Sequence, residues 1–241
     1  DLTDAPAETL VPLGSISGIV EEDVDNDDVG DEPIEGIMVQ LQDATGTVIG
    51  TTTTDSTGFY IFYDLPIGIY TVTEENPTNF VDVTDADGPI LQGPNDDTDS
   101  TILEVPVGPG ENVTDQDFVD EELKTISGVV LEDTDDDGEG DDPVPGSTVS
   151  LISPEGDVID STTTDSDGVF EFTDVVPGDG YKVVQENPPD FTDVTDTDGT
   201  TGGTTLSEIL VDVSEEDAPD LVFVDELASA APSGGPTASP T

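Results

Sequence analysis

The sequence contains no cysteine, no histidine and no tryptophan among its 241 residues, and its two basic residues are both lysines, Lys124 and Lys182. The absence of cysteine and histidine excludes a thiolate nucleophile, an imidazole base, a disulfide and a zinc site of the Cys/His type. The absence of arginine excludes a guanidinium clamp for a phosphate or carboxylate group. Since a general base, a nucleophile and a cofactor motif are all lacking, we expect that the protein is not an enzyme.

Positive charge is scarce, whereas 59 Asp and Glu residues give the chain a formal net charge of −57. Such a chain cannot neutralise phosphates, which excludes nucleic acid as a partner, and it is repelled by an anionic membrane surface. No apolar run approaches the roughly 18–20 residues of a transmembrane helix, so we expect no membrane span in this chain. The chain begins at Asp1 without a signal-peptide pattern, and we expect a processed or partial chain.

Aromatic residues are few, with eight Phe and four Tyr, and hydrophobic residues make up 32% of the chain. The cores must therefore be small and built mostly from Val, Ile and Leu. Acidity of this degree is typical of disordered segments. The pattern along the chain nevertheless indicates folded units.

The chain contains the same unit twice. Corresponding segments are residues 16–20 and 126–130, 52–55 and 162–165, 58–62 and 168–172, 75–77 and 186–188, and 118–121 and 223–226. A period of roughly 100 residues is typical of whole domains in tandem, since solenoid repeats run ~20–50 residues. The predicted organisation is an N-terminal extension, a first domain, a short linker, a second domain and a Ser/Thr/Pro-rich tail, at residues 1–15, 16–120, 121–125, 126–227 and 228–241.

Each copy has the pattern of a β protein. Short runs rich in β-branched and aromatic residues are found at 39–41, 60–63, 70–73 and 102–105, and Gly, Pro, Asn and Asp separate them. No segment sustains the apolar period of a helix. About seven strands in roughly 100 residues are typical of a β-sandwich, so the sequence predicts an all-β chain with two tandem sandwiches. Residues 9–11 are a further candidate strand, which would pair with another subunit.

Aspartates alternate with other residues in one loop of each copy. They occupy positions 1, 3, 5 and 9 of the loop, namely Asp23, Asp25, Asp27 and Asp31, and then Asp133, Asp135, Asp137 and Asp141. Position 7, which is Val29 or Glu139, can offer a backbone carbonyl, and Gly138 stands at position 6, where an EF-hand loop turns. Ca²⁺ takes six to eight oxygens at about 2.3–2.6 Å, and this spacing curls short carboxylates around one point.

The EF-hand glutamate at position 12 is missing, because Ile34 and Val144 stand there. We expect the remaining ligands to come from Asp85 and Asp87 in the first copy, and from Asp196 and Asp198 in the second. The acidic run at 96–99 is a further candidate in the first copy only. A solvated acidic loop and a general adaptation to high salt are the alternatives. Because the spacing recurs while the intervening residues vary, and because acids concentrate in loops, we favour Ca²⁺ sites.

Several motifs, in the same order in both copies, resemble one known family. In the first copy they are Gly18-x-Val20 before the aspartate loop, Gly36-x-x-Val39-x-Leu41, Thr54-Asp55-x-x-Gly58-x-Tyr60-x-Phe62, Tyr70-x-Val72 with Pro77-x-x-Phe80, and 110–118. They are similar to the calcium-binding B repeats of serine-aspartate repeat (SdrD-type) surface adhesins, in the Cna B-type, prealbumin-like group. The resemblance covers about 16–120 and 126–226. It implies Greek-key β-sandwiches, which Ca²⁺ stiffens into a stalk on a cell surface or in an extracellular fibre.

Several further features of the sequence are candidates for chemistry or modification. The paired acids Glu74 and Glu75 suit glycosidase chemistry in principle, but Gln185 replaces Glu74 in the second copy and no sugar-stacking aromatics lie nearby, which favours structural acids. Asn112-Val113-Thr114 is an N-glycosylation sequon in a predicted turn, so Asn112 is the candidate glycan site of a glycoprotein. The terminal tail is a candidate for O-glycans.

Together these features predict an extracellular, cell-surface structural protein, a calcium-stabilised stalk or fibre subunit. Its expected partners are calcium ions, further copies or neighbouring repeats of the same kind, and glycans. A terminal segment pairing with an exposed sheet edge of the next subunit would give a head-to-tail filament. The alternative is an adhesin that binds a protein or matrix ligand through its loops, which would require an exposed apolar or aromatic patch.

Overall fold

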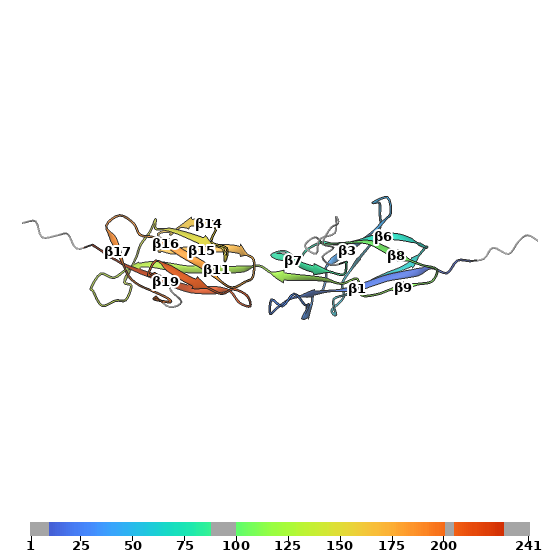
Figure 1. The fold of residues 1–241 in the computed structure, drawn as a ribbon, viewed down its shortest axis with the longest axis horizontal. Helices are drawn as coiled ribbons and strands as arrows, with labels where there is room; N and C mark the ends of the chain where they lie inside the picture. The colour runs from blue at the N-terminus through green and yellow to red at the C-terminus, as the bar shows by residue number, and fades with distance from the viewer. Residues whose placement is uncertain (1–9, 88–99, 201–204, 229–241) are drawn as a thin grey trace, which may run out of the picture. The chain divides into compact units, whose positions relative to one another are not determined.

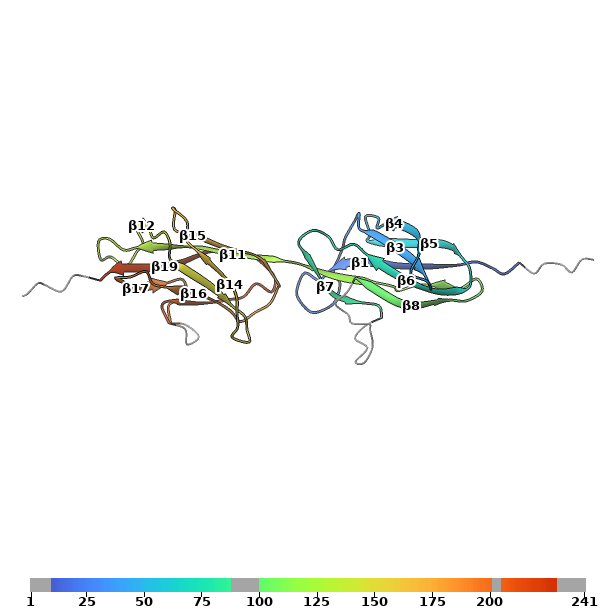
Figure 2. The same cartoon turned by 90° about the horizontal axis from the view of Figure 1, so that it is seen from above.

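A computed structural model of the chain describes residues 10–87, 100–200 and 205–228, and the regular elements in these ranges are all strands. The chain divides into two compact units, Asp1–Leu123 and Lys124–Thr241. The predicted all-β class with two tandem β-sandwich domains is confirmed (Figures 1 and 2). A helix capable of crossing a membrane is not found in the described ranges.

The first unit contains two sheets. One has the order β2 (Glu32–Pro33), β1 (Gly14–Glu22), β10 (Phe118–Glu122) and β7 (Phe80–Asp85), and β5 (Phe59–Leu65) and β9 (Asn112–Val113) also pair with β1. The other has the order β4 (Val48–Thr53), β3 (Met38–Asp43), β6 (Gly68–Glu74) and β8 (Thr101–Val107). Neighbours in the sheets are mostly not neighbours in sequence, as in a Greek-key sandwich.

The second unit repeats this topology. Its first sheet has the order β12 (Asp142–Pro143), β11 (Lys124–Glu132), β19 (Ala218–Leu227) and β17 (Phe191–Asp196), with β15 (Val169–Val175) on β11. Its second sheet has the order β14 (Val158–Thr163), β13 (Thr148–Ile152), β16 (Tyr181–Glu186) and β18 (Glu208–Val211). The long strand β19 occupies the place of β9 and β10.

Alternating apolar side chains from the two sheets of a unit meet in its core. On β6, for example, Tyr70 and Val72 are buried, and on β3 the buried residues are Val39 and Leu41. Three aromatic rings mark the centre of each core. Tyr60 lies 6.0 Å from Phe62 and 6.4 Å from Phe118 between ring centroids, and the equivalent residues of the second unit are Phe170, Phe172 and Phe223. The small cores expected from the composition are thus filled by a few aromatics among aliphatic residues.

The first and last strands of each unit pair in parallel. On β1 and β10, Val20 pairs with Phe118 and Glu22 pairs with Asp120. On β11 and β19 the pairing continues over a longer stretch, from Ile126 to Glu132. The chain therefore enters and leaves each unit through adjacent strands.

The predicted boundaries differ slightly from those of the structure. The first strand begins at Gly14, and in the predicted linker 121–125 only Leu123 lies outside a strand. The reason is pairing: Glu122 pairs with Phe80 on β7, and Lys124 pairs with Val175 on β15. Of the candidate strand 9–11, residues 10 and 11 are exposed and lie outside any strand. Residue 9 and most of the predicted tail, 229–241, are outside the described residues.

Candidate metal centre

The first aspartate loop begins where β1 ends, and backbone hydrogen bonds close it at both ends. The Asp23 N–H donates to the Asp120 carbonyl on β10, and the Asp31 N–H donates to the Glu22 carbonyl on β1, each over 2.8 Å. Only 2% of Asp23 is exposed, although most of the loop is solvent-accessible. The loop is thus a defined structure anchored to the strand pair β1–β10.

Side chains of the loop accept hydrogen bonds from its own backbone. Asp23 accepts from the Asp27 N–H through Oδ1 (3.2 Å) and from the Asp28 N–H through Oδ2 (2.8 Å). Asp27 Oδ1 accepts from the Val29 N–H (3.0 Å), and Asp31 Oδ2 accepts from the Val24 N–H (3.1 Å). These bonds curl the chain around Asp23, as the alternating spacing predicts.

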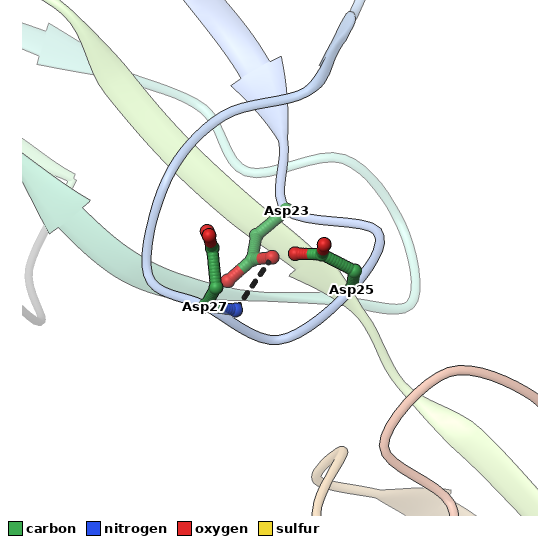
Figure 3. A group of neighbouring side chains, drawn as sticks. All are labelled: Asp23, Asp25 and Asp27. Carbon is green, nitrogen blue, oxygen red and sulfur yellow. Dashed lines mark hydrogen bonds between the residues drawn. The ribbon is translucent and has the colours of Figure 1, made fainter.

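Three carboxylates converge inside the curl. Asp23, Asp25 and Asp27 each offer an oxygen, and these oxygens lie within 4.8 Å of one another (Figure 3). Two oxygens on opposite sides of a Ca²⁺ ion are about 4.8 Å apart, so the spacing suits this ion. Residues 14–123 contain no lysine or arginine, so no basic side chain of this unit offsets the repulsion.

The second unit has the same loop after β11. Asp133 is 5% exposed, and its N–H donates to the Asp225 carbonyl over 2.8 Å. Its side chain accepts from the Asp137 N–H (3.3 Å) and from the Gly138 N–H (2.8 Å). The converging oxygens here belong to Asp133, Asp135 and Asp141, again within 4.8 Å. Each of the two loops therefore brings three of its four predicted aspartates together.

Electrostatic strain is evident in the second loop. The neighbouring charge of Asp137 is the main cause that raises the pKa of Asp135, and slight desolvation, Asp141 and Asp133 act in the same direction. Hydrogen bonds from the Thr134 hydroxyl and N–H lower the pKa of Asp141. Asp141 is thus held as an anion facing Asp135, an arrangement that a cation would stabilise.

The tight turn at position 6 does not require glycine. Asp28 has a φ of 66°, close to the 87° of Gly138 at the same position of the second loop. Aspartate is one of the few non-glycine residues that tolerate this left-handed region. The departure from the glycine pattern in the first copy therefore leaves the loop path unchanged.

The oxygen set fits a hard cation. Position 7 turns toward the loop, because Val29 donates its N–H to Asp27, and Glu139 donates its N–H to Asp137 (2.9 Å). Their carbonyls are the ligands that the EF-hand pattern assigns to this position. At position 12, Val144 is buried and Ile34 packs against the core, so these positions serve the core. A Ca²⁺ ion would complete its shell with water or another carbonyl.

The second pair of predicted ligands forms a separate turn. The Asp87 N–H donates to Asp85 Oδ1 (3.0 Å), and Asp87 Oδ2 accepts from the Leu103 N–H (2.7 Å). In the second unit, Asp196 Oδ1 accepts from the Gly199 N–H (2.6 Å) and Asp198 Oδ2 accepts from the Leu210 N–H (3.0 Å). Burial raises the pKa of Asp196 to about 6. Neither pair is in the converging groups of the described residues, so these aspartates stay separate candidates rather than members of the loops. The further candidate run 96–99 lies outside the described residues.

One converging group was not predicted as a site. It consists of Glu74, Asp82 and Asp120 in the first unit, whose oxygens also lie within 4.8 Å of one another. From the sequence alone, Glu74 is predicted to be a structural acid. The alternation Tyr70, Val72, Glu74 on β6 places Glu74 on the buried face and was the available indication.

The candidate glycan acceptor lies on a strand rather than in the predicted turn. Asn112 is exposed and begins β9, because it pairs with Ser15 on β1. The Ser15 hydroxyl donates to Asn112 Oδ1 over 2.8 Å.

Comparisons with known proteins give consistent results. A family model described as "SdrD B-like domain" matches residues 14–117 and 124–215. Serine-aspartate repeat-containing protein F of Staphylococcus epidermidis is 31% identical over 195 residues, which cover 78% of this chain and 12% of that protein. Serine-aspartate repeat-containing protein E of Staphylococcus aureus is 35% identical over 190 residues, covering 75% and 16%. This chain therefore spans only a small part of the length of these relatives.

Several solved structures also align with this chain. The Bacillus anthracis TIE protein aligns with a TM-score of 0.38 and 16% identity, over 90% of this chain and 34% of that one. Shaft pilin SpaA of Lactobacillus rhamnosus GG aligns with a TM-score of 0.37 and 11% identity, over 91% and 100%. A streptococcal ancillary pilin aligns with a TM-score of 0.40 and 14% identity, over 89% and 63%.

Proposed function

Because this chain belongs to the SdrD B-like domain family of extracellular, cell-surface proteins, we propose that it is a structural stalk or fibre subunit whose β-sandwich domains are stabilised by Ca²⁺. The observation that carries this proposal is the anchoring of the aspartate loops. Each loop extends the first strand of its unit, and its first aspartate is bonded to the last strand. An ion in the loop would therefore hold together the strands through which the chain enters and leaves.

Electrostatics gives the ion a large effect. Clustered carboxylates repel one another, and a net charge of −57 opposes a compact state. A divalent ion that binds only the folded state adds RT ln(1 + [L]/Kd), about 2.7 kcal/mol at a hundredfold excess over Kd. Domain stabilities are typically ~5–15 kcal/mol, so one such site is a substantial fraction of the total.

The strand arrangement suits a load-bearing role. Tension on the two ends of a unit pulls β1 and β10 along each other, because these terminal strands are parallel. The hydrogen bonds between them lie across the direction of pull, share the load and break together. An ion in the adjacent loop would add its coordination bonds to this resistance.

Single-molecule pulling of the full chain tests the role. We expect both units to unfold at higher force in Ca²⁺ than in chelator. In an Asp135→Asn variant, we expect the second unit to unfold at the same force in both buffers. Equal unfolding forces in the two buffers would remove the mechanical role of the ion.

Polymerisation is a further part of the proposal. Three exposed apolar residues precede β1, namely Leu10 (89% exposed), Val11 (53%) and Leu13 (52%). They provide an apolar segment for pairing with a sheet edge of a second copy. Removing residues 1–12 leaves β1 intact, and removing 229–241 leaves β19 intact. We expect either deletion to abolish filaments in electron micrographs without changing the melting temperature. Unchanged filaments would refute this part.

An adhesin that binds a protein or matrix ligand is the second candidate function. The observation that favours it is the exposure of Val48 and Ile49 on β4 and of Val158 and Ile159 on β14, at equivalent positions of two edge strands. Charged substitutions at these four positions would abolish ligand capture by an adhesin and leave a purely structural stalk unaffected.

Asn112 is the proposed glycan site. Its exposure leaves room for a glycan. Expression in a host with N-glycosylation should add glycan mass that Thr114→Ala removes, and an unmodified peptide containing Asn112 from that host would exclude the site.

A further inference from the structure

A second acidic group lies in the first unit, apart from the side chains of the aspartate loop. It brings together Glu74 at the end of β6, Asp82 on β7 and Asp120 on β10. Strand β6 belongs to one sheet of the sandwich, and β7 and β10 belong to the other. The group therefore spans the two layers of the unit.

The carboxylates of Glu74 and Asp120 are buried without a donor. Glu74 is 8% exposed and Asp120 is 1% exposed. All four of their side-chain oxygens are inaccessible and accept no hydrogen bond from an N–H or hydroxyl group of the described residues, and the two carboxyl groups interact with each other. A buried carboxylate without a partner is costly, and the usual remedies are a proton, a hydrogen-bond donor or a bound cation.

The second unit uses a hydrogen-bond donor at the same place. Gln185, which pairs with Val149 as Glu74 pairs with Val39, donates from Nε2 to Asp225 Oδ2 over 2.7 Å. Asp225 pairs with Asp193 as Asp120 pairs with Asp82. The two acids are thus retained, and one amide replaces the third. The first unit therefore lacks the hydrogen bond that the Gln185 amide donates to Asp225 in the second.

A proton alone leaves the first site highly charged. One proton shared between Glu74 and Asp120 would still leave two negative charges among the three carboxylates. Residues 14–123 supply no basic side chain for these charges. A divalent cation matches the remaining charge.

Neutral oxygens lie beside the acids. The Ser100 hydroxyl lies 2.7 Å from Asp82 Oδ1 and also within hydrogen-bond distance of the side-chain oxygen of Asn76, so its one proton serves one of these two acceptors at a time. Three carboxylate oxygens within 4.8 Å of one another, with hydroxyl and amide oxygens beside Asp82, form the kind of oxygen donor set that Ca²⁺ prefers over softer ligands.

We propose that Glu74, Asp82 and Asp120 bind a divalent cation of the Ca²⁺ class between the two sheets of the first unit, and that Gln185 makes this ion unnecessary in the second. The three ligands are separate from the side chains of the aspartate loops, although the Asp120 carbonyl also accepts the Asp23 N–H that anchors the first loop. The first unit then holds one more ion than its loop accounts for, and that ion ties β6 to β10 across the core.

Counting bound Ca²⁺ on the full chain tests the proposal, by native mass spectrometry and by calorimetric titration of verified metal-free protein. Glu74→Gln copies the residue of the second unit, and Glu75→Gln, at the exposed neighbour, is the matched control. We expect Glu74→Gln to bind one ion fewer than wild type and Glu75→Gln to bind the same number. Metal-free Glu74→Gln should also melt at a higher temperature than metal-free wild type, which shows that the variant folds.

The outcomes separate this site from the loops. An unchanged ion count in folded Glu74→Gln overturns the proposal and leaves a shared proton as the balancing charge, while the loop ions stand. If Glu74→Gln binds one ion fewer and Asp135→Asn binds as many ions as wild type, the result supports this site and contradicts the proposed Ca²⁺ site in the second loop. Wild type that binds no Ca²⁺ would overturn both.

Discussion

The backbone N–H of Asp23 donates a hydrogen bond to the carbonyl oxygen of Asp120, with 2.8 Å between nitrogen and oxygen. Asp133 and Asp225 repeat this bond at the same distance in the second unit. Through it, the first aspartate of each loop continues the parallel pairing of the terminal strands. Ordering of the loop is therefore coupled to the integrity of the strand pair, which is the basis of the predictions below.

Asp135→Asn should have opposite effects with and without Ca²⁺. In Ca²⁺ it removes a charged ligand, and we expect the affinity of the second loop to fall by about tenfold or more, or ~1.4 kcal/mol. In chelator it removes the repulsion from Asp137 and Asp141, and we expect a higher melting temperature than wild type.

The matched control is Asp136→Asn. Asp136 lies in the same loop with a φ of 62°, a conformation that asparagine adopts equally well, and it is outside the converging group. Isothermal titration measures the Ca²⁺ affinity of both variants, and melting curves in chelator measure their metal-free stability. We expect Asp135→Asn to lose more affinity than Asp136→Asn. Equal loss of affinity in the two variants would show that only the total charge of the loop counts.

The metal-free first unit should lose stability as pH rises above neutrality. The pKa of Glu74 is raised from 4.5 to about 10 by burial and by the charge of Asp120. Since the pKa of Glu74 is higher in the folded state than in the unfolded state, the folded state binds this proton more tightly. The contribution of this proton to the free energy of unfolding is therefore full below pH 4.5 and is lost as the pH rises toward 10. Ordinary carboxyl groups, with pKa values near 4, no longer titrate above about pH 6.5.

The buried groups Asp120, Asp196 and Asp225, with pKa values of about 6, are also almost fully ionised by about pH 7.5, so melting in chelator at about pH 7.5 and 9 isolates Glu74. We expect wild type to melt at a lower temperature at the higher pH and Glu74→Gln to melt at the same temperature at both. A slope that persists in Glu74→Gln would assign the effect to another residue.

Gly58→Ala should destabilise the first unit more than Gly36→Ala. Both glycines have positive φ values, 71° and 87°, so each substitution carries the left-handed cost of about 1–2 kcal/mol. A Cβ on Gly58 would also lie 2.5 Å from the Val20 carbonyl oxygen, whereas one on Gly36 would meet nothing within 4 Å. The clash adds roughly 1–3 kcal/mol.

Chemical unfolding of the two variants measures this difference. Gly168→Ala and Gly146→Ala form the same pair in the second unit and provide an internal repeat. Equal destabilisation by the two members of a pair would mean that the β1–β5 contact adapts to the extra methyl group.

Most of the fold was predictable because its determinants are local. Alternation around Val39, Tyr60 and Tyr70 indicated strands, and these residues lie on β3, β5 and β6. Duplication of the motifs indicated two domains. The extent of the terminal strands was less predictable, because residues around Leu123 become strand residues only through pairing with distant strands β7 and β15.

The aspartate loops were predictable for the same reason, since their ligands are neighbours in sequence. The group of Glu74, Asp82 and Asp120 was not, because its members come from three strands and meet only after the sheets pack. Asp85 and Asp87 illustrate the converse. They are far from the aspartate loop in sequence, so nothing local indicated which residues they would contact. In the structure their hydrogen bonds form a turn next to Leu103.

Differential scanning calorimetry of the full chain, in Ca²⁺ and in verified metal-free buffer at the same ionic strength, tests the central claim most directly. At a hundredfold excess over Kd one ion adds about 2.7 kcal/mol, which corresponds to a shift of roughly 10–20 °C for a domain of this size. We predict that Ca²⁺ raises the melting temperature of both units by at least this order. Superimposable melting curves in the two buffers would contradict the account.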